Sequence, residues 1–247
     1  MKKISIEKAF FGLLVAIMSI TFIACTIIFF TSDVENTVGY YGYFFWVPLR
    51  PLVLSNHMVT ILLTLTPAFI IWRARLIAPK GMIAAWGIFM FSSSYLGSTL
   101  DLYFVIWQWD KVMHAYSGGL LVILGFMLIK VMHKDNELPK GYSPMFISAA
   151  AFCFAMTVGV VWEIYEFSID WLFDGNMQRW ARQYLDGTRV PLEGQEALYD
   201  TMNDFMANMV GGIIVWIIGY LSLKKNGKFY NWMKFTKKPP REDKLII

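Results

Sequence analysis

The sequence predicts an all-α fold: a polytopic membrane protein built as one bundle of six transmembrane helices, with both termini in the cytoplasm. The composition is the first indication, because 57% of the residues are hydrophobic, only 16% are charged and the mean hydropathy is +0.48. The second is a series of apolar runs of about the 20 residues that a helix needs to cross a bilayer. The net charge of +4 lies in short loops and in the tail, so we expect no nucleic acid as a partner.

Six spans are expected in order along the chain, and each is an apolar run bounded by polar or charged residues. They cover residues 9–30, 52–72, 81–100, 112–132, 145–172 and 203–223. The first run follows a short basic segment, but it is longer than the apolar core of a signal peptide and no small-residue cleavage pattern follows it. We therefore expect it to be retained, and residues 1–247 to form a single membrane domain.

Lys and Arg residues predict the direction of the spans. Most of the 22 basic residues lie at the ends that would share one side with the N-terminus, and basic loops stay in the cytoplasm. This places both termini inside and makes 173–202 an extracytoplasmic loop. Residues 224–247 become a basic cytoplasmic tail that can touch anionic lipid.

Acidic residues concentrate at the opposite, outer ends of the spans. Most of the 18 Asp and Glu residues lie there. The positive-inside rule does not account for their position, because it depends on Lys and Arg and only little on acidic residues. An ionisable side chain at the centre of a membrane helix costs about 2.5–3.5 kcal/mol. Several such groups at one depth therefore indicate a site.

The last three spans each carry a polar stripe, because residues three or four apart share one face of a helix. The stripes are Asp110 and His114 on the fourth span, Glu163, Glu166 and Asp170 on the fifth, and Asp200, Asp204 and Asn208 on the sixth. At 1.5 Å per residue, Glu163 lies deepest, and the others lie closer to the outer headgroups. The stripes meet if these three spans are neighbours.

Four kinds of chemistry fit this set of residues. His114, Glu163, Glu166 and Asp204 are predicted as catalytic acid/base groups, and the same four as ligands of a divalent metal ion. The carboxylates could instead relay protons or cations. They could also join helices through hydrogen bonds worth about 0.6–2 kcal/mol. Asp110, Asp170 and Asp200 fit an interfacial capping role equally well.

Substrate-binding residues are predicted near the same end of the bundle: Asp110, Asn208, Arg179 and Arg182. The two arginines lie in the outer loop, where a guanidinium can bind a phosphate or carboxylate arriving from the outer leaflet. Acidic residues in the same loop are alternative partners for them. A cluster of tryptophans near the outer ends is explained by an interfacial aromatic belt.

Three segments in a fixed order carry a family resemblance. They are Trp109-Asp110-Lys111-Val112-Met113-His114 with Gly118-Gly119, then Trp162-Glu163-Ile164-Tyr165-Glu166, then Asp200 to Asp204 continuing through Asn208 and Gly211. Over residues 101–223 the chain resembles the YjdF-like family of bacterial inner-membrane proteins and, more remotely, the VanZ-like family. The resemblance implies a multi-pass protein of the bacterial inner membrane. VanZ-like proteins are associated with glycopeptide resistance, but where they often have Glu-x-x-Gln this chain has Glu163-x-x-Glu166, which makes its site more acidic.

These expectations lead to three functional hypotheses. The first is a metal-assisted enzyme acting on outer-leaflet lipid or a lipid-linked envelope precursor, with membrane lipids as partners. The second is an ion- or proton-coupled transporter or lipid translocator, which ranks lower because the inner halves of the last four spans are almost wholly apolar. The third is a non-catalytic membrane scaffold. The sequence does not predict an oligomeric state.

Overall fold

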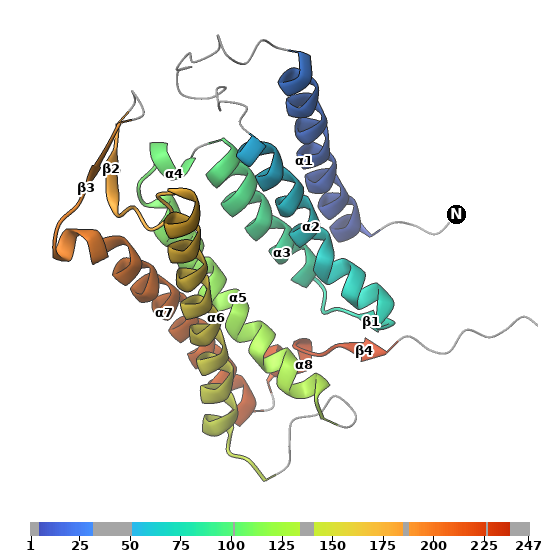
Figure 1. Ribbon diagram of the computed structural model, residues 1–247. Helices are drawn as coiled ribbons and strands as arrows, with labels where there is room; N and C mark the ends of the chain where they lie inside the picture. The colour runs from blue at the N-terminus through green and yellow to red at the C-terminus, as the bar shows by residue number, and fades with distance from the viewer. Residues whose placement is uncertain are drawn as a thin grey trace, which may run out of the picture.

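The computed structural model describes residues 5–31, 51–100, 102–133, 141–184, 188–225 and 227–237. Asp101 and residues 226 and 238–247 of the basic tail lie outside these described residues. The helices are α1 (Ile6–Thr31), α2 (Pro51–Arg73), α3 (Met82–Met90), the π-helix η2 (Phe91–Thr99), α4 (Leu102–Val105), α5 (Trp109–Val131), α6 (Pro144–Phe173), α7 (Gln195–Lys224) and α8 (Lys228–Trp232) (Figure 1). The all-α class predicted from the sequence is confirmed.

Two short antiparallel strand pairs complete the described structure. β1 (Leu76–Ile77) pairs with β4 (Thr236–Lys237), and so joins the segment after α2 to the segment after α8. β2 (Ala181–Gln183) pairs with β3 (Arg189–Pro191) in a hairpin between α6 and α7. The hairpin lies where the sequence predicts the long outer loop.

Four of the described helices are long and apolar enough to cross a membrane: α1 over Ile6–Ile27, α5, α6 and α7. α2 adds a shorter apolar helix over His57–Arg73. The predicted third span corresponds to α3 and η2, which follow each other without a break in helical backbone. Four candidate spans are therefore established by length and composition, and the count of six stays a prediction.

The boundaries of α6 and α7 have local causes. The Ser143 side chain accepts a hydrogen bond from the Phe146 N–H at 3.1 Å, and Pro144 occupies the first helical turn, as is typical of a helix start. α7 begins at Gln195, well before the predicted start of its apolar run at residue 203. One continuous helix therefore carries the whole stripe of Asp200, Asp204 and Asn208.

α5, α6 and α7 pack against one another, which answers whether the last three predicted spans are neighbours (Figure 1). Their common core includes the fully buried side chains of Val122, Phe126 and Ala151. α1, α2, α3 and η2 form a second group beside them, and α3 and η2 both contact α5. The polar stripes thus lie within the three-helix group, at the end nearest the β2–β3 hairpin.

The segment between α6 and α7 is held on the end of α6. The Asp170 carboxylate accepts hydrogen bonds from the backbone N–H groups of Met177 at 2.7 Å and Gln178 at 2.9 Å. The Asn176 amide side chain bonds both the N–H and the C=O of Ala181. Asp170 therefore acts as a loop anchor, a variant of the capping role considered for it.

Candidate functional site

Lys111, in the first turn of α5, is the centre of a partly buried network of ion pairs. Its ammonium donates to the carboxylates of Asp200 at 2.5 Å and Asp204 at 2.7 Å on α7, and to Asp110 at 3.1 Å. It also lies 3.4 Å from the backbone carbonyl oxygen of Asp200. An ammonium has three N–H groups, so these contacts use its whole donor capacity. The network joins the outer ends of α5 and α7.

His114 lies one turn further along α5 and faces α7. Its Nε2 atom is 3.5 Å from Asp110 Oδ1 and 3.6 Å from Asp204 Oδ1. The potential ligand atoms of these three residues all lie within 4.8 Å of one another. One imidazole and two carboxylates suit Zn, Mn or Fe, so Asp110, His114 and Asp204 form a group that could hold a metal ion.

Arg179 reaches the site from the loop after α6. Its guanidinium donates to the backbone carbonyl of Tyr103 at 3.0 Å, and lies 3.8 Å from Asp110 Oδ2 and 3.7 Å from Asp200 Oδ1. The residue has a left-handed backbone, with φ of 49°, which is uncommon for a residue other than glycine. This conformation turns the side chain of a loop residue toward the acidic groups of α5 and α7.

Tyr103, on the short helix α4, borders the same group of charges. Burial raises the pKa of the Tyr103 hydroxyl, and the negative charges of Asp110 and Glu166 raise it further. The phenol therefore stays protonated and keeps its O–H as a hydrogen-bond donor beside the carboxylates.

Glu163 and Glu166 bring the polar stripe of α6 to this site, and they are only 4% and 6% exposed. Glu166 Oε1 accepts a hydrogen bond from the Trp162 indole at 2.7 Å. Electrostatic interactions couple Glu166 to Glu163, Asp110 and Asp204. All three helices therefore contribute carboxylates to one electrostatic neighbourhood.

Several buried carboxylate oxygens in this neighbourhood lack a hydrogen-bond donor among the described residues. They are both oxygens of Glu163 and the Oδ2 atoms of Asp200 and Asp204. The Gln178 side-chain amide lies beside Glu163, but it donates to the Glu163 backbone carbonyl oxygen at 3.4 Å and to the Thr201 hydroxyl at 3.0 Å rather than to the carboxylate oxygens. Buried acceptors without donors are costly, so the site favours a ligand that is a cation or a hydrogen-bond donor.

Asn208 lies one turn below Asp204, where the three helices come closest. A Cβ atom at Gly118 of α5 would overlap the Asn208 carbonyl oxygen, and one at Gly159 of α6 would overlap the Asn208 side-chain amide. Only glycine leaves room for Asn208 between the two neighbouring helices. Asn208 is 2% exposed and forms the inner boundary of the site.

The structure brings together seven of the eight residues that the sequence predicts for the site. The seven are Asp110, His114, Glu163, Glu166, Arg179, Asp204 and Asn208. Arg182 instead lies in the β2–β3 hairpin. The group within metal-ligand distance contains His114 and Asp204 from the predicted ligands, together with Asp110, which was expected to bind substrate. The catalytic, substrate-binding and metal roles stay predictions.

Sequence reasoning did not assign a role to Lys111 or Tyr103. A signal for Lys111 was present, because it is the one lysine of the chain that falls on the predicted outer side. A lone lysine between two acidic stripes would be expected to pair with them. No comparable signal existed for Tyr103, because its position depends on the packing of α4.

A family model described as "Predicted membrane protein (DUF2238)" matches residues 17–225, a range that includes every residue of the site. The chain belongs to this family. An uncharacterized protein of Thermotoga maritima is 27% identical to the chain over 143 residues, which are 57% of this chain and 62% of that relative. The match thus covers less than two thirds of the relative's length. No solved structure matches the chain. The narrower YjdF-like and VanZ-like resemblances stay predictions.

Proposed function

We propose that this member of the DUF2238 family is a six-span protein of the bacterial inner membrane, with both termini in the cytoplasm, that performs metal-assisted chemistry on an outer-leaflet lipid or a lipid-linked envelope precursor. The observation that carries the proposal is the convergence of α5 and α7 carboxylates around Lys111 and His114, with the buried Glu163 and Glu166 of α6 in the same electrostatic neighbourhood. Ionisable groups at this depth are costly and usually serve function.

Asp110, His114 and Asp204 would hold the divalent metal ion. Lys111 donates to Oδ1 of Asp204, whereas Oδ2 is buried and accepts no hydrogen bond within the described part of the chain. Oδ2 is therefore the oxygen available to a second cation. A bound metal would supply a Lewis acid for a phosphate or carbonyl oxygen of the substrate.

Among the described residues, Glu163 is the one we assign as the general acid or base. It is buried beside the metal group on a separate helix, and no described donor occupies its oxygens. A carboxylate without a fixed donor can accept a proton from a substrate or a water molecule and return it later. Lys111 and Arg179 would orient the surrounding carboxylates rather than react.

Metal analysis of the purified full-length protein tests the ligand assignment. The wild type is loaded with Zn²⁺, Mn²⁺ or Fe²⁺, dialysed and analysed for bound metal. We expect His114→Ala and Asp204→Asn to lose more than the roughly 10–100-fold in affinity that loss of an outer-shell partner costs. His133→Ala is the matched control, because His133 is exposed at the other end of α5. Equal metal content in all variants, or none in the wild type, contradicts the metal site.

Turnover tests the enzyme assignment separately. Wild type and Glu163→Gln are incubated in vesicles with bacterial lipid extract and lipid-linked precursors, and the products are identified by mass spectrometry. We expect a product that requires Glu163. Ion flux or lipid transbilayer movement without a product would favour a transporter. Absence of product, flux and lipid movement in both the wild type and Glu163→Gln would favour a scaffold.

A further inference from the structure

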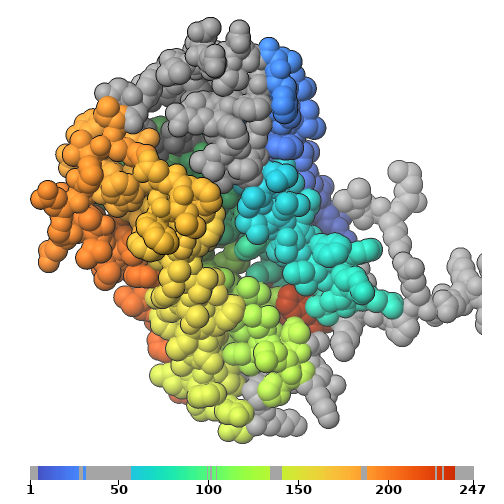
Figure 2. Space-filling model, in the orientation of Figure 1, coloured from blue at the N-terminus to red at the C-terminus, as the bar shows by residue number. Residues whose placement is uncertain are grey.

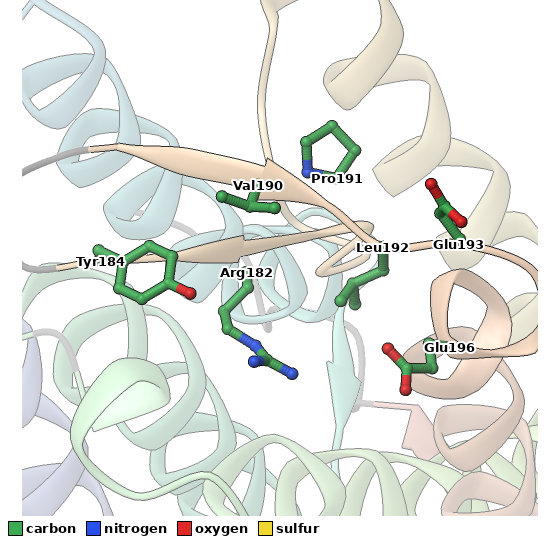
Figure 3. Close-up of a pocket in the computed structure, with 7 residues that line it drawn as sticks. All are labelled: Arg182, Tyr184, Val190, Pro191, Leu192, Glu193 and Glu196. Carbon is green, nitrogen blue, oxygen red and sulfur yellow. The ribbon is translucent and has the colours of Figure 1, made fainter.

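A shallow hollow of about 320 Å³ lies on the β2–β3 hairpin (Figure 3). It is lined by Arg182 and Tyr184, by residues 190–193 and by Glu196 at the start of α7. The hollow belongs to the outer segment and takes no part in the ion-pair network around Lys111.

The strand register explains which side chains face the hollow. Arg182 pairs with Val190, and directly opposed residues of an antiparallel pair share one face. Because side chains alternate along a strand, Tyr184 lies on this face as well. The other pair, Gln183 with Arg189, lies on the opposite face, where Arg189 binds the Asp174 carboxylate at 2.6 Å.

Charges of both signs line the hollow without neutralising each other. Figure 3 shows the Arg182 guanidinium and the Glu196 carboxylate on the same side of the hairpin, with Leu192 between them. Within the described ranges, no ion pair joins Arg182 to Glu193 or Glu196. A ligand that carries an anion and a cation a few bonds apart would satisfy both ends.

The surroundings of the hollow indicate a lipid as the source of that ligand. The two helix ends that the hairpin joins carry exposed apolar side chains, namely Trp171 and Phe173 at the end of α6 and Leu198 and Tyr199 at the start of α7. Aromatic side chains of this kind are typical of the level of the lipid headgroups. In the space-filling view, the hairpin and the end of α6 form one continuous surface (Figure 2).

We infer that the hollow binds the zwitterionic head group of an aminophospholipid. The Arg182 guanidinium, assisted by the Tyr184 hydroxyl, binds the phosphate, and the Glu196 carboxylate binds the primary ammonium. The inference rests on the proposed function, since it names the lipid class that the protein recognises beside its buried site. Arg179, three residues before Arg182, already reaches that site.

Lipid titration of the detergent-purified full-length protein tests this inference. Dioleoyl phosphatidylethanolamine, phosphatidylglycerol and phosphatidylcholine are added in turn, and bound lipid is counted by native mass spectrometry. We expect phosphatidylethanolamine to bind at least about tenfold more tightly than the other two, because only its ammonium has N–H groups for Glu196. Arg182→Gln and Glu196→Gln should each remove this preference, and Gln183→Ala on the opposite face should keep it.

Two further arms make the result decisive. Soluble glycerophosphoethanolamine added in excess should compete with the lipid if the head group alone is recognised; competition only by intact lipid would place recognition in the acyl chains and overturn the inference. Equal binding of the three lipids, or an unchanged preference in both variants, would also overturn it. Metal binding by Asp110, His114 and Asp204 is measured separately from lipid binding at the hairpin, so a failure of this inference is distinguishable from a failure of the proposed metal site.

Discussion

Lys111 shows how a single side chain determines the character of the site. Its ammonium contacts Asp110, Asp200 and Asp204 at 2.5 to 3.1 Å, and Asp204 is 1% exposed. Two buried carboxylates on adjacent turns of α7 would repel each other in a low dielectric without this cation. The lysine therefore allows α7 to keep its acidic stripe against α5.

Replacing Lys111 by Met is expected to destabilise the protein by about 3–5 kcal/mol, because it leaves buried carboxylates without a partner. Thermal unfolding in detergent, followed by circular dichroism, measures the effect. The double variant Lys111→Met with Asp204→Asn should recover part of the loss, since it removes a stranded charge. Lys80→Met, an exposed lysine before α3, is the control. Similar stability of Lys111→Met and wild type would mean that the network is not structural.

At the scale of elements, the contact between α5 and α7 depends on glycine residues at the helix crossing. A Cβ atom on Gly211 of α7 would overlap the carbonyl oxygen of Ala115, which is backbone and cannot move aside. Gly119 lies against the same stretch of α7, near Gly211 and Val215. Small residues at such a crossing let two membrane helices approach closely, and this brings Lys111 within reach of Asp204.

Gly211→Ala is therefore expected to separate the helices and to cost about 1–3 kcal/mol, the usual cost of overpacking. Gly12→Ala on α1 is a matched control, because nothing lies within 4 Å of the added Cβ there. Melting temperatures of the two variants in the same detergent make the comparison. A Gly211→Ala protein as stable as Gly12→Ala would show that the helices do not approach as closely as described.

The elements also show what could be predicted from sequence. Apolar runs located α1, α5, α6 and α7, because hydropathy reports burial in lipid, and the i, i+4 spacing identified the polar faces. Hydropathy could not predict that α7 begins at Gln195, since that part of the helix is polar. The strands of the β2–β3 hairpin are three residues each, too short for an alternating pattern.

The site was predicted in part for a related reason. Spacing along one helix predicts which residues share a face, but not which residue of another helix they meet. The role of Lys111 and the exact partner set of His114 therefore required the packing of α5 against α7. The approach of Arg179 depends on a left-handed loop conformation that no sequence pattern indicates for arginine.

At the scale of the whole molecule, the arrangement is asymmetric along the helix axes. The β2–β3 hairpin lies at one end of the three long helices, and α8 lies at the other (Figure 1). The ion pairs of Lys111 with Asp200 and Asp204 lie at the hairpin end, as do the exposed Trp171 and Phe173 of α6. Under the proposed orientation, the first end faces the outside of the cell and α8 faces the cytoplasm.

Cysteine labelling in intact cells tests this orientation. In a background without Cys25 and Cys153, we expect Gln183→Cys in the hairpin to react with a membrane-impermeant maleimide. Lys228→Cys on α8 should react only after the cells are lysed. Both side chains are exposed, so accessibility within the protein does not bias the result. The reverse pattern of labelling would invert the orientation and place the site on the cytoplasmic side.

The order of Lys111 and α7 along the chain has a consequence for biosynthesis. α7 carries Asp200, Asp204 and Asn208, and as an isolated segment leaving the translocon it would meet lipid with its acids unneutralised. α5 is translated earlier, so the counterion is already in the bilayer when the last long helix arrives. During co-translational insertion, α7 can then pack directly against the inserted α5, and its carboxylates pair with Lys111 instead of being exposed to lipid as unpaired charges.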